Sequence, residues 1–320
     1  NNEPVKDEGA VYLSGNGPLV AVLTEALARD NYLKCRSEGI KKNKTDSLRE
    51  VKKSIQMIHR YRDTMLAKIK NPVENGVLEI DPEKAVKMED AGFGEVEHVA
   101  IFDEAQRSWT HKRLADYLKR GGTYGNKLKV PNFPMSEAAF LIWSLDQRED
   151  WATIVCLVGG GQEINTGEAG IEEWFNTLSN KYPDWNIYVS DKIYDHEYTN
   201  GKNINDLLNS LNNLNIEEKL HLSVSTRSFR SEKQSDFIKK LLDLNFTEAT
   251  NDLIELKDKY PIYLTRDLNK AKNWIKSKAR GSERYGIVAS SGAKRLRKYG
   301  IWVDSSIDAA AWFLNTKEDV

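Results

Sequence analysis

The chain has 320 residues, 40% of them hydrophobic and 30% charged, which is enough for about two domains with sizeable cores. Lysine and arginine (47) nearly balance aspartate and glutamate (48), so the net charge of -1 excludes a general attraction to nucleic acid or membranes. Two cysteines exclude a disulfide framework, and the sequence has neither a bilayer-length apolar run nor a signal-peptide core, so we expect a cytoplasmic protein without membrane contact.

The first predicted unit is a strand, a tight turn and a helix. Ala10 to Leu13 form the strand, and "SGNG" supplies residues that tolerate a positive φ. Pro18 suits the first turn of a helix, and the apolar residues that follow it have helical spacing. This stretch is therefore typical of a βα unit.

Residues 46–70 predict an amphipathic helix, within a helical insertion at about 40–95. Their apolar residues recur at three-four spacing, and Ser47 with Glu50 forms a candidate capping box. Only Arg62 interrupts the apolar stripe. We expect this helix to pack on a core, because a partner-binding coiled coil requires more heptads.

Three further strands are predicted within "HVAIFDEAQ" (98–106), "WATIVCLVGGGQ" (151–162) and "DWNIYVS" (184–190). The first two are continuously apolar, as in a parallel sheet that is covered on both faces. The asparagine-rich residues 200–215 predict a connector or surface helix near a domain boundary.

The second part of the chain again alternates predicted strands and helices. The strands are expected at 221–229, 260–265 and 285–290, and the helices at 231–244, 266–279 and 291–300. The predicted fold class is therefore α/β, with mostly parallel sheets in two layered domains, residues 1–215 and 216–320. Basic runs in the last two helices can contact phosphates, although a solvated helix face is the simpler interpretation.

Asp103 and Glu104 lie side by side where an apolar strand ends, which is a position where α/β sheets bind ligands. An aspartate there can hold Mg²⁺, and a neighbouring glutamate can orient or deprotonate an attacking water. The alternative is two solvated acids at a helix start, where they suit the helix dipole.

The stretch "LVGGGQEINTGEAG" (157–170) is a second candidate ligand-binding turn. Its glycines permit close approach of the backbone to a ligand, and Gln162 can then reach a terminal phosphate or the attacking water. The alternative is a glycine-rich turn that leads into a helix.

Together, "IFDEAQRSW" and "SEAAFLIWSLDQREDWATIVCLVGGGQEINTGEAGIEEW" resemble the uncharacterised bacterial DNA/RNA helicase family related to the Schlafen group 3 helicase domain. The wider class is the superfamily 1 helicases, which are P-loop ATPases. "LSGNGPLV" and "SSGAKRLRKYGI" fit the same family, so the resemblance covers nearly the whole chain. It implies two RecA-like domains that bind ATP and Mg²⁺.

The resemblance also implies roles for residues of the first domain. Asp103 resembles the Walker B aspartate that holds magnesium, and Glu104 resembles the catalytic glutamate. Gln106 belongs to the same motif and would couple ATP to nucleic acid. Gln162 resembles the glutamine that senses the γ-phosphate, although "GGGQ" lacks the acid usual in that turn.

Further roles are implied at both ends of the chain. "STRSFRSE" resembles the region where an arginine of the second domain reaches the γ-phosphate, with Arg230 as the first candidate and Arg227 as the second. The first-domain turn resembles a motif that touches the nucleic-acid backbone, with Ser14, Gly15, Asn16 and Gly17. A surface arginine and a plain turn are the respective alternatives.

No G-x-x-x-x-G-K-[ST] phosphate cradle is present in the sequence, and the late motifs of the family are also missing. We therefore expect a fragment of a helicase or translocase in which both domains are incomplete and which alone hydrolyses little or no ATP. The competing hypothesis is a non-catalytic RecA-like module that binds nucleic acid or a partner. Neither hypothesis predicts an oligomeric state.

Overall fold

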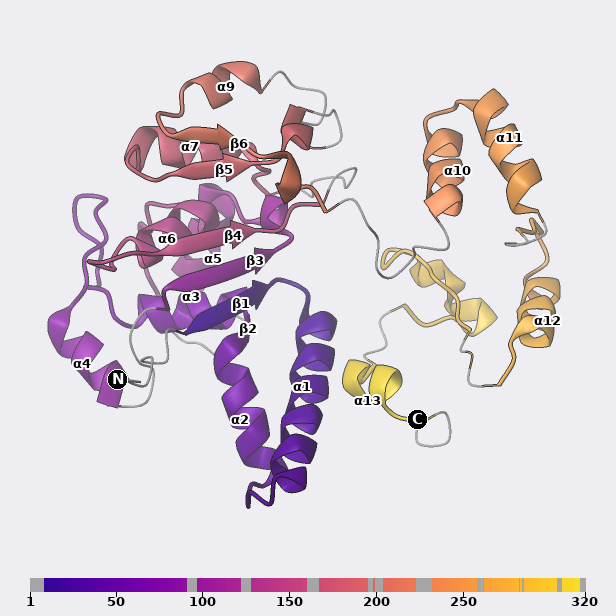
Figure 1. Ribbon diagram of the computed structural model, residues 1–320, viewed down its shortest axis with the longest axis horizontal. Coiled ribbons are helices and arrows are strands. Elements are labelled where there is room, and N and C mark those ends of the chain that lie inside the picture. Colours follow the sequence, from indigo (N-terminus) through magenta and orange to yellow (C-terminus); the bar gives the residue numbers. More distant parts are fainter. Residues whose placement is uncertain are drawn as a thin grey trace. The chain divides into compact units, whose positions relative to one another are not determined.

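The computed structural model describes residues 9–90, 97–121, 128–159, 167–194, 198, 204–222, 232–257, 260, 262–281, 283, 285–303 and 307–316 (Figure 1). By its internal contacts the chain divides into two compact units. The first unit contains Asn1–Glu218 and Ile307–Asn315, and the second contains Lys219–Ser306. Within the described residues, no helix is both long and apolar enough to cross a membrane.

The first unit is built on a four-stranded sheet in which every neighbouring pair is parallel. Its strands, in spatial order, are β2 (Ile55–Met57), β1 (Ala10–Ser14), β3 (Val99–Asp103) and β4 (Thr153–Cys156). A second parallel pair joins β5 (Ile187–Val189) to β6 (Leu214–Ile216). These parallel pairs and the many helices confirm the predicted α/β class and agree with a RecA-like fold.

Helices connect and cover these strands. The helices of the first unit are α1 (Gly17–Ser37), α2 (Lys44–Ser54), α3 (Ile58–Leu66), α4 (Pro82–Asp90), α5 (His111–Arg120), α6 (Glu137–Leu145), α7 (Glu172–Lys181), α9 (Asn205–Asn209) and α13 (Ala309–Leu314). Short 3₁₀ turns occur at η1 (Ala105–Arg107), η2 (Asp191–Tyr194) and η3 (Glu218–Leu220). The predicted start of α1 is confirmed, because Pro18 lies in its first turn and the Asn16 side chain accepts a hydrogen bond from Leu19 N–H.

The C-terminal helix α13 returns to the first unit and packs on α1 (Figure 1). Arg29 of α1 donates hydrogen bonds to Leu314 O at 3.4 Å and to Asn315 Oδ1 at 2.9 Å. The first unit therefore contains segments from both ends of the chain, which pack against each other.

The single helix predicted at 46–70 is wrong. The structure breaks it into α2 and α3 with strand β2 between them, and β2 pairs with Tyr12–Ser14 of β1. The predicted capping box is also wrong, since α2 begins earlier and the Asn43 side chain caps it by accepting from Asp46 N–H. The tertiary reason is the sheet edge, where Ile55 is buried and its backbone gains a ladder partner.

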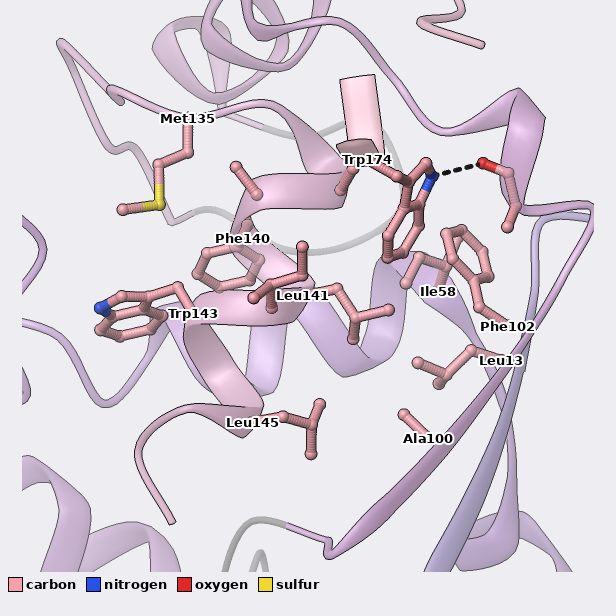
Figure 2. Packing of buried hydrophobic residues seen from close by; sticks show 14 of the residues in the cluster. Leu13, Ile58, Ala100, Phe102, Met135, Phe140, Leu141, Trp143, Leu145 and Trp174 are labelled. Carbon is pink, nitrogen blue, oxygen red and sulfur yellow. Dashed lines mark hydrogen bonds between the residues drawn. The ribbon is translucent and has the colours of Figure 1, made fainter. Parts of the chain in front are cut away.

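The core of the first unit centres on α6, whose nine residues are all buried. Figure 2 shows Leu145 of this helix facing Leu13 and Ala100 of the sheet, while Phe140 lies beside Trp143 on the side away from the strands. A helix that is buried on every side is apolar all round, which explains why "EAAFLIWSL" has no polar stripe.

The second unit is helical in its described residues. Its elements are α10 (Glu232–Leu242), α11 (Phe246–Leu256), α12 (Leu268–Lys278) and the 3₁₀ turn η4 (Lys294–Tyr299). Three buried apolar side chains form its described core, with Tyr260 packed against them: Phe237, Ala249 and Leu256.

The strands predicted at 260–265 and 285–290 are not formed in the parts of those segments that the structure describes. Leu264 is 99% exposed and Val288 is 100% exposed, so neither side chain has an apolar surface to pack on. An apolar run becomes a strand only where a neighbouring strand satisfies its backbone, and these segments have none among the described residues. The third predicted strand, 221–229, lies almost wholly outside the described residues.

Candidate functional site

The predicted acid pair lies at the carboxyl end of the parallel sheet. Ser14 ends β1 and Asp103 ends β3, and the two residues are paired across these strands. The Ser14 hydroxyl donates a hydrogen bond to Asp103 Oδ2 at 3.2 Å, and Asn16 N–H donates to Ser14 Oγ at 3.1 Å. The "SGNG" turn and the first acid therefore form one hydrogen-bonded group.

Glu104 has a left-handed backbone, with φ 55° and ψ 45°. This conformation is costly for a residue with a side chain and persists only where its surroundings enforce it. Here Gln106 Nε2 donates a 2.7 Å hydrogen bond to Glu104 Oε2. The strand thus ends in a sharp turn at Glu104.

Gln106 connects Glu104 to the glycine-rich turn. It is 5% exposed, and its Oε1 accepts a hydrogen bond from Gly159 N–H at 3.3 Å. The neighbouring Ala105 N–H donates to Leu157 O at 3.0 Å. A single buried amide therefore links the second acid of "DEAQ" to the first glycine of "GGGQ".

The far end of the glycine-rich turn is attached to the same segment. Thr110 N–H donates to Gly167 O, Ala169 N–H to Ser108 O, and Gly170 N–H to Gln106 O, at 2.8 to 3.1 Å. Gly167 has a φ of +90°, and a Cβ on it would lie 2.7 Å from Arg113 Cδ, so no other residue fits there without strain. Both ends of the glycine-rich stretch 157–170 are therefore hydrogen-bonded to the segment of residues 105–110.

Behind the site, a buried ion pair fixes Trp109. Glu137 N–H donates to Trp109 O, and Trp109 N–H donates to Glu137 Oε2, both at 3.0 Å. The opposite oxygen, Glu137 Oε1, accepts from Arg62 Nη1 at 3.2 Å, and the Arg62 side chain is 0% exposed. We call Arg62, Glu137 and Trp109 the buried brace.

Aromatic rings surround the guanidinium of this brace. The Arg62 guanidinium carbon lies 5.3 Å from the Trp109 ring centroid and 4.9 Å from that of Tyr117. Burial raises the pKa of the Glu137 carboxyl, against the opposing effects of Arg62 and the Trp109 N–H. Sequence reasoning did not find the brace, although Arg62 was the one break in the apolar stripe, which is the signature of a buried and paired charge.

A tryptophan of the core also contacts the site. Trp174 of α7 donates its indole N–H to Ala105 O at 3.0 Å, the bond drawn as a dashed line in Figure 2. It packs near Phe102 of β3, with ring centroids 5.7 Å apart. The carbonyl that follows Glu104 is therefore held by the core.

The structure brings together four of the predicted site residues, namely Ser14, Asp103, Glu104 and Gln106. Gly15 and Gly17 lie in the turn beside them, and the Asn16 side chain caps α1. Gln162, Arg227 and Arg230 lie outside the described residues. The nucleic-acid role predicted for Ser14 to Gly17 stays a prediction.

The donor set suits a magnesium ion that arrives with a nucleotide. Mg²⁺ is usually held by one or two carboxylates together with substrate phosphates and water, and Asp103 supplies such a carboxylate beside the Ser14 hydroxyl. Among the described residues, no three His, Cys, Asp or Glu side chains are grouped closely enough to hold a metal ion. The magnesium role of Asp103 stays a prediction.

The family model described as the Schlafen group 3 DNA/RNA helicase domain matches residues 2–320. No curated protein and no solved structure matches the chain. Because the match spans nearly every residue, the chain belongs to the Schlafen group 3 DNA/RNA helicase domain family.

Proposed function

We propose that this chain belongs to an ATP-dependent DNA or RNA helicase or translocase, which couples ATP hydrolysis to the binding or movement of nucleic acid. Membership of the helicase-domain family supports a helicase-like role with use of a nucleotide and a metal. The observation that carries the proposal is the hydrogen-bonded path from Glu104 through Gln106 to Gly159 at the carboxyl ends of β3 and β4. In open α/β sheets this is the edge where ligands bind.

In this proposal Asp103 would hold Mg²⁺, with its Oδ2 oriented by the Ser14 hydroxyl. A bound ion would supply positive charge next to the phosphates of ATP. Glu104 takes a proton from the attacking water, and Gln106 keeps the carboxylate of Glu104 in a fixed direction. Since Gln106 also contacts Gly159, movement of the glycine-rich turn would change the position of the base.

The remaining roles follow from the family and belong to the proposal. Gln162 would sense the γ-phosphate from the glycine-rich turn. Arg230, or in second place Arg227, would complete the nucleotide site from the second RecA-like domain. The turn from Ser14 to Gly17 would contact the nucleic-acid backbone through its N–H groups.

The test is phosphate release from Mg-ATP by the product of the complete reading frame, with and without single-stranded DNA or RNA. We expect stimulation by one polymer and a loss of about 100-fold or more in Glu104→Gln, because a positioned general base contributes about 10² to 10⁴. Glu149→Gln removes an exposed acid far from β3 in the chain and serves as the matched control, with wild-type rates expected.

Two results would contradict the proposal. Equal rates in wild type and Glu104→Gln would remove the catalytic role of the acid pair. No hydrolysis by the wild type under any condition would favour a non-catalytic module that binds nucleic acid or a partner.

A further inference from the structure

The positive charge of the chain is concentrated in one part of the second unit. Residues 262–303 contain eleven lysines and arginines but only two acids, Asp267 and Glu283, whereas the whole chain has a net charge of -1. The rest of the chain is therefore acidic overall. A local excess of this kind is the electrostatic footprint expected of a polyanion-binding surface.

The densest part of this region is the turn η4 and the residues that follow it. Lys294, Arg295, Arg297 and Lys298 are exposed, while Leu296 between them is half-buried. Gly300 ends the turn in a left-handed conformation, with φ 74° and ψ 19°. Four exposed cations thus lie on one short element. We call residues 294–302 the cation-aromatic turn.

Two large rings lie on the same turn. Trp302 is 62% exposed and Tyr299 is 53% exposed, although burial of such side chains is strongly favourable. The Arg297 guanidinium carbon lies 5.3 Å from the Trp302 ring centroid, and Lys298 Nζ lies 4.9 Å from that of Tyr299. Cations and aromatic faces are therefore presented to solvent next to each other.

Three of the cations on this turn have no ion pair among the residues that the structure describes. Over the part of the chain that the structure describes, no ion pair involves Lys294, Arg295 or Lys298. By contrast, Lys233 and Lys240 of α10 each pair with an acid of α11. Lys294, Arg295 and Lys298 thus lie on the turn that also carries the exposed rings.

We propose that the cation-aromatic turn binds single-stranded nucleic acid without sequence preference. The cations contact phosphates, and the faces of Trp302 and Tyr299 stack on bases. Exposed aromatic faces favour a single strand, because its bases can leave their own stack, whereas those of a duplex cannot. This inference rests on the proposed function, for which it names a nucleic-acid contact in the second unit.

The test measures binding of fluorescein-labelled dT and rU oligonucleotides to the product of the complete reading frame by anisotropy, over a range of salt concentrations. In the variant with Lys294, Arg295, Arg297 and Lys298 each changed to Gln, we expect weaker binding. The slope of log K against log[salt] should fall by up to about 3, since each phosphate contact on a single strand contributes about 0.7.

Trp302→Ala separates stacking from charge. Its affinity should fall about tenfold, as expected for the loss of one stacked base, while the salt slope stays at the wild-type value. The charge control changes Lys34, Lys41, Lys52 and Lys53 of the first unit to Gln, all of them exposed, and should bind as the wild type does. Circular dichroism checks that each variant is folded.

Each outcome separates this inference from the proposed function. If the wild type binds and both turn variants bind equally well, the turn is not the site and the proposed function stands. If the wild type binds neither oligonucleotide, the nucleic-acid role itself fails. If the four-Gln change abolishes binding to phosphatidylserine vesicles and leaves oligonucleotide binding unchanged, the surface recognises lipid and the inference is overturned.

Discussion

The two units differ in how they use their apolar residues. In the first unit, apolar side chains from β1, β3, α3, α6 and α7 meet in one buried cluster. In the second, the described core consists of Phe237, Ala249 and Leu256, and large apolar side chains such as Leu264 and Val288 are fully exposed. The polar groups of the first unit's site therefore lie next to a large buried core. The charges and aromatic rings of the second unit lie on its surface.

This difference separates two kinds of site. The acid pair of the first unit is held by one amide contact, from Gln106 to Glu104, and one hydroxyl contact, from Ser14 to Asp103. The cation-aromatic turn of the second unit needs only exposure and charge, because phosphates are recognised without exact geometry. Removing a large apolar side chain should consequently lower the free energy of unfolding much more in the first unit than in the second.

The largest expected effect is on stability when the core of the first unit is opened. Phe140 is buried between Phe133 and Trp143, with ring centroids 5.5 Å from each. Phe140→Ala should lower the free energy of unfolding by about 4 kcal/mol, because it removes buried area and leaves a cavity. Leu264→Ala, at a side chain that is 99% exposed, should change it by less than about 0.5 kcal/mol.

Urea unfolding followed by circular dichroism measures both variants. Similar decreases in the free energy of unfolding for Phe140→Ala and Leu264→Ala would contradict the difference in packing between the two units.

A slightly smaller effect is expected when the buried brace loses one partner. Arg62→Met removes the cation and leaves the Glu137 carboxyl buried and unpaired, which should cost about 3 kcal/mol. In Arg62→Met/Glu137→Gln the charge is gone but an acceptor for Trp109 N–H remains, so part of the loss should be recovered.

A double-mutant cycle that includes Glu137→Gln alone gives the coupling between the two residues from their unfolding midpoints. A single-variant loss below about 1 kcal/mol, with no recovery in the double variant, would show that water already reaches the pair.

The smallest effect expected is a change in acid sensitivity. Burial, with the nearby charges of Arg62 and Arg113, lowers the pKa of His59 from 6.5 to about 4. Between these two values the unfolded chain binds a proton that the folded unit does not, so stability is present above pH 6.5 and is lost as the pH falls towards 4.

In His59→Gln the unfolded chain no longer binds this proton, because glutamine does not titrate. The drop in Tm from pH 7 to pH 5 should therefore be smaller in His59→Gln than in the wild type, although other groups still titrate in both. An equal drop in the two proteins would place His59 in contact with solvent.

Much of the first unit could be predicted from local patterns. The runs that became β1, β3 and β4 are short, apolar and followed by turn residues, and the turn before Pro18 was recognised as the start of α1. The position of Asp103 and Glu104 at a strand end likewise follows from the point where the apolar run stops. These signals are local, because strand alternation and helix caps depend on residues only a few positions apart.

Other features could not be predicted, because distant residues determine them. Ile55 to Met57 lie within a helical pattern and became a strand only because β1 offered an edge. Leu264 and Val288 lie in runs that look like strands, yet they gain no neighbour among the described residues. Arg62 looked like a break in an amphipathic stripe until Glu137, 75 positions away, supplied its partner.

The order of residues along the chain thus determined the α/β class, the ends of the strands and the acids that follow them, since these depend on local spacing. Contacts between distant segments determined the pairing of Ser14 with Asp103, the path from Glu104 through Gln106 to Gly159, and the buried brace. The physical reason is that a buried polar group is stable only when a partner satisfies it, and here each partner comes from another strand, turn or helix.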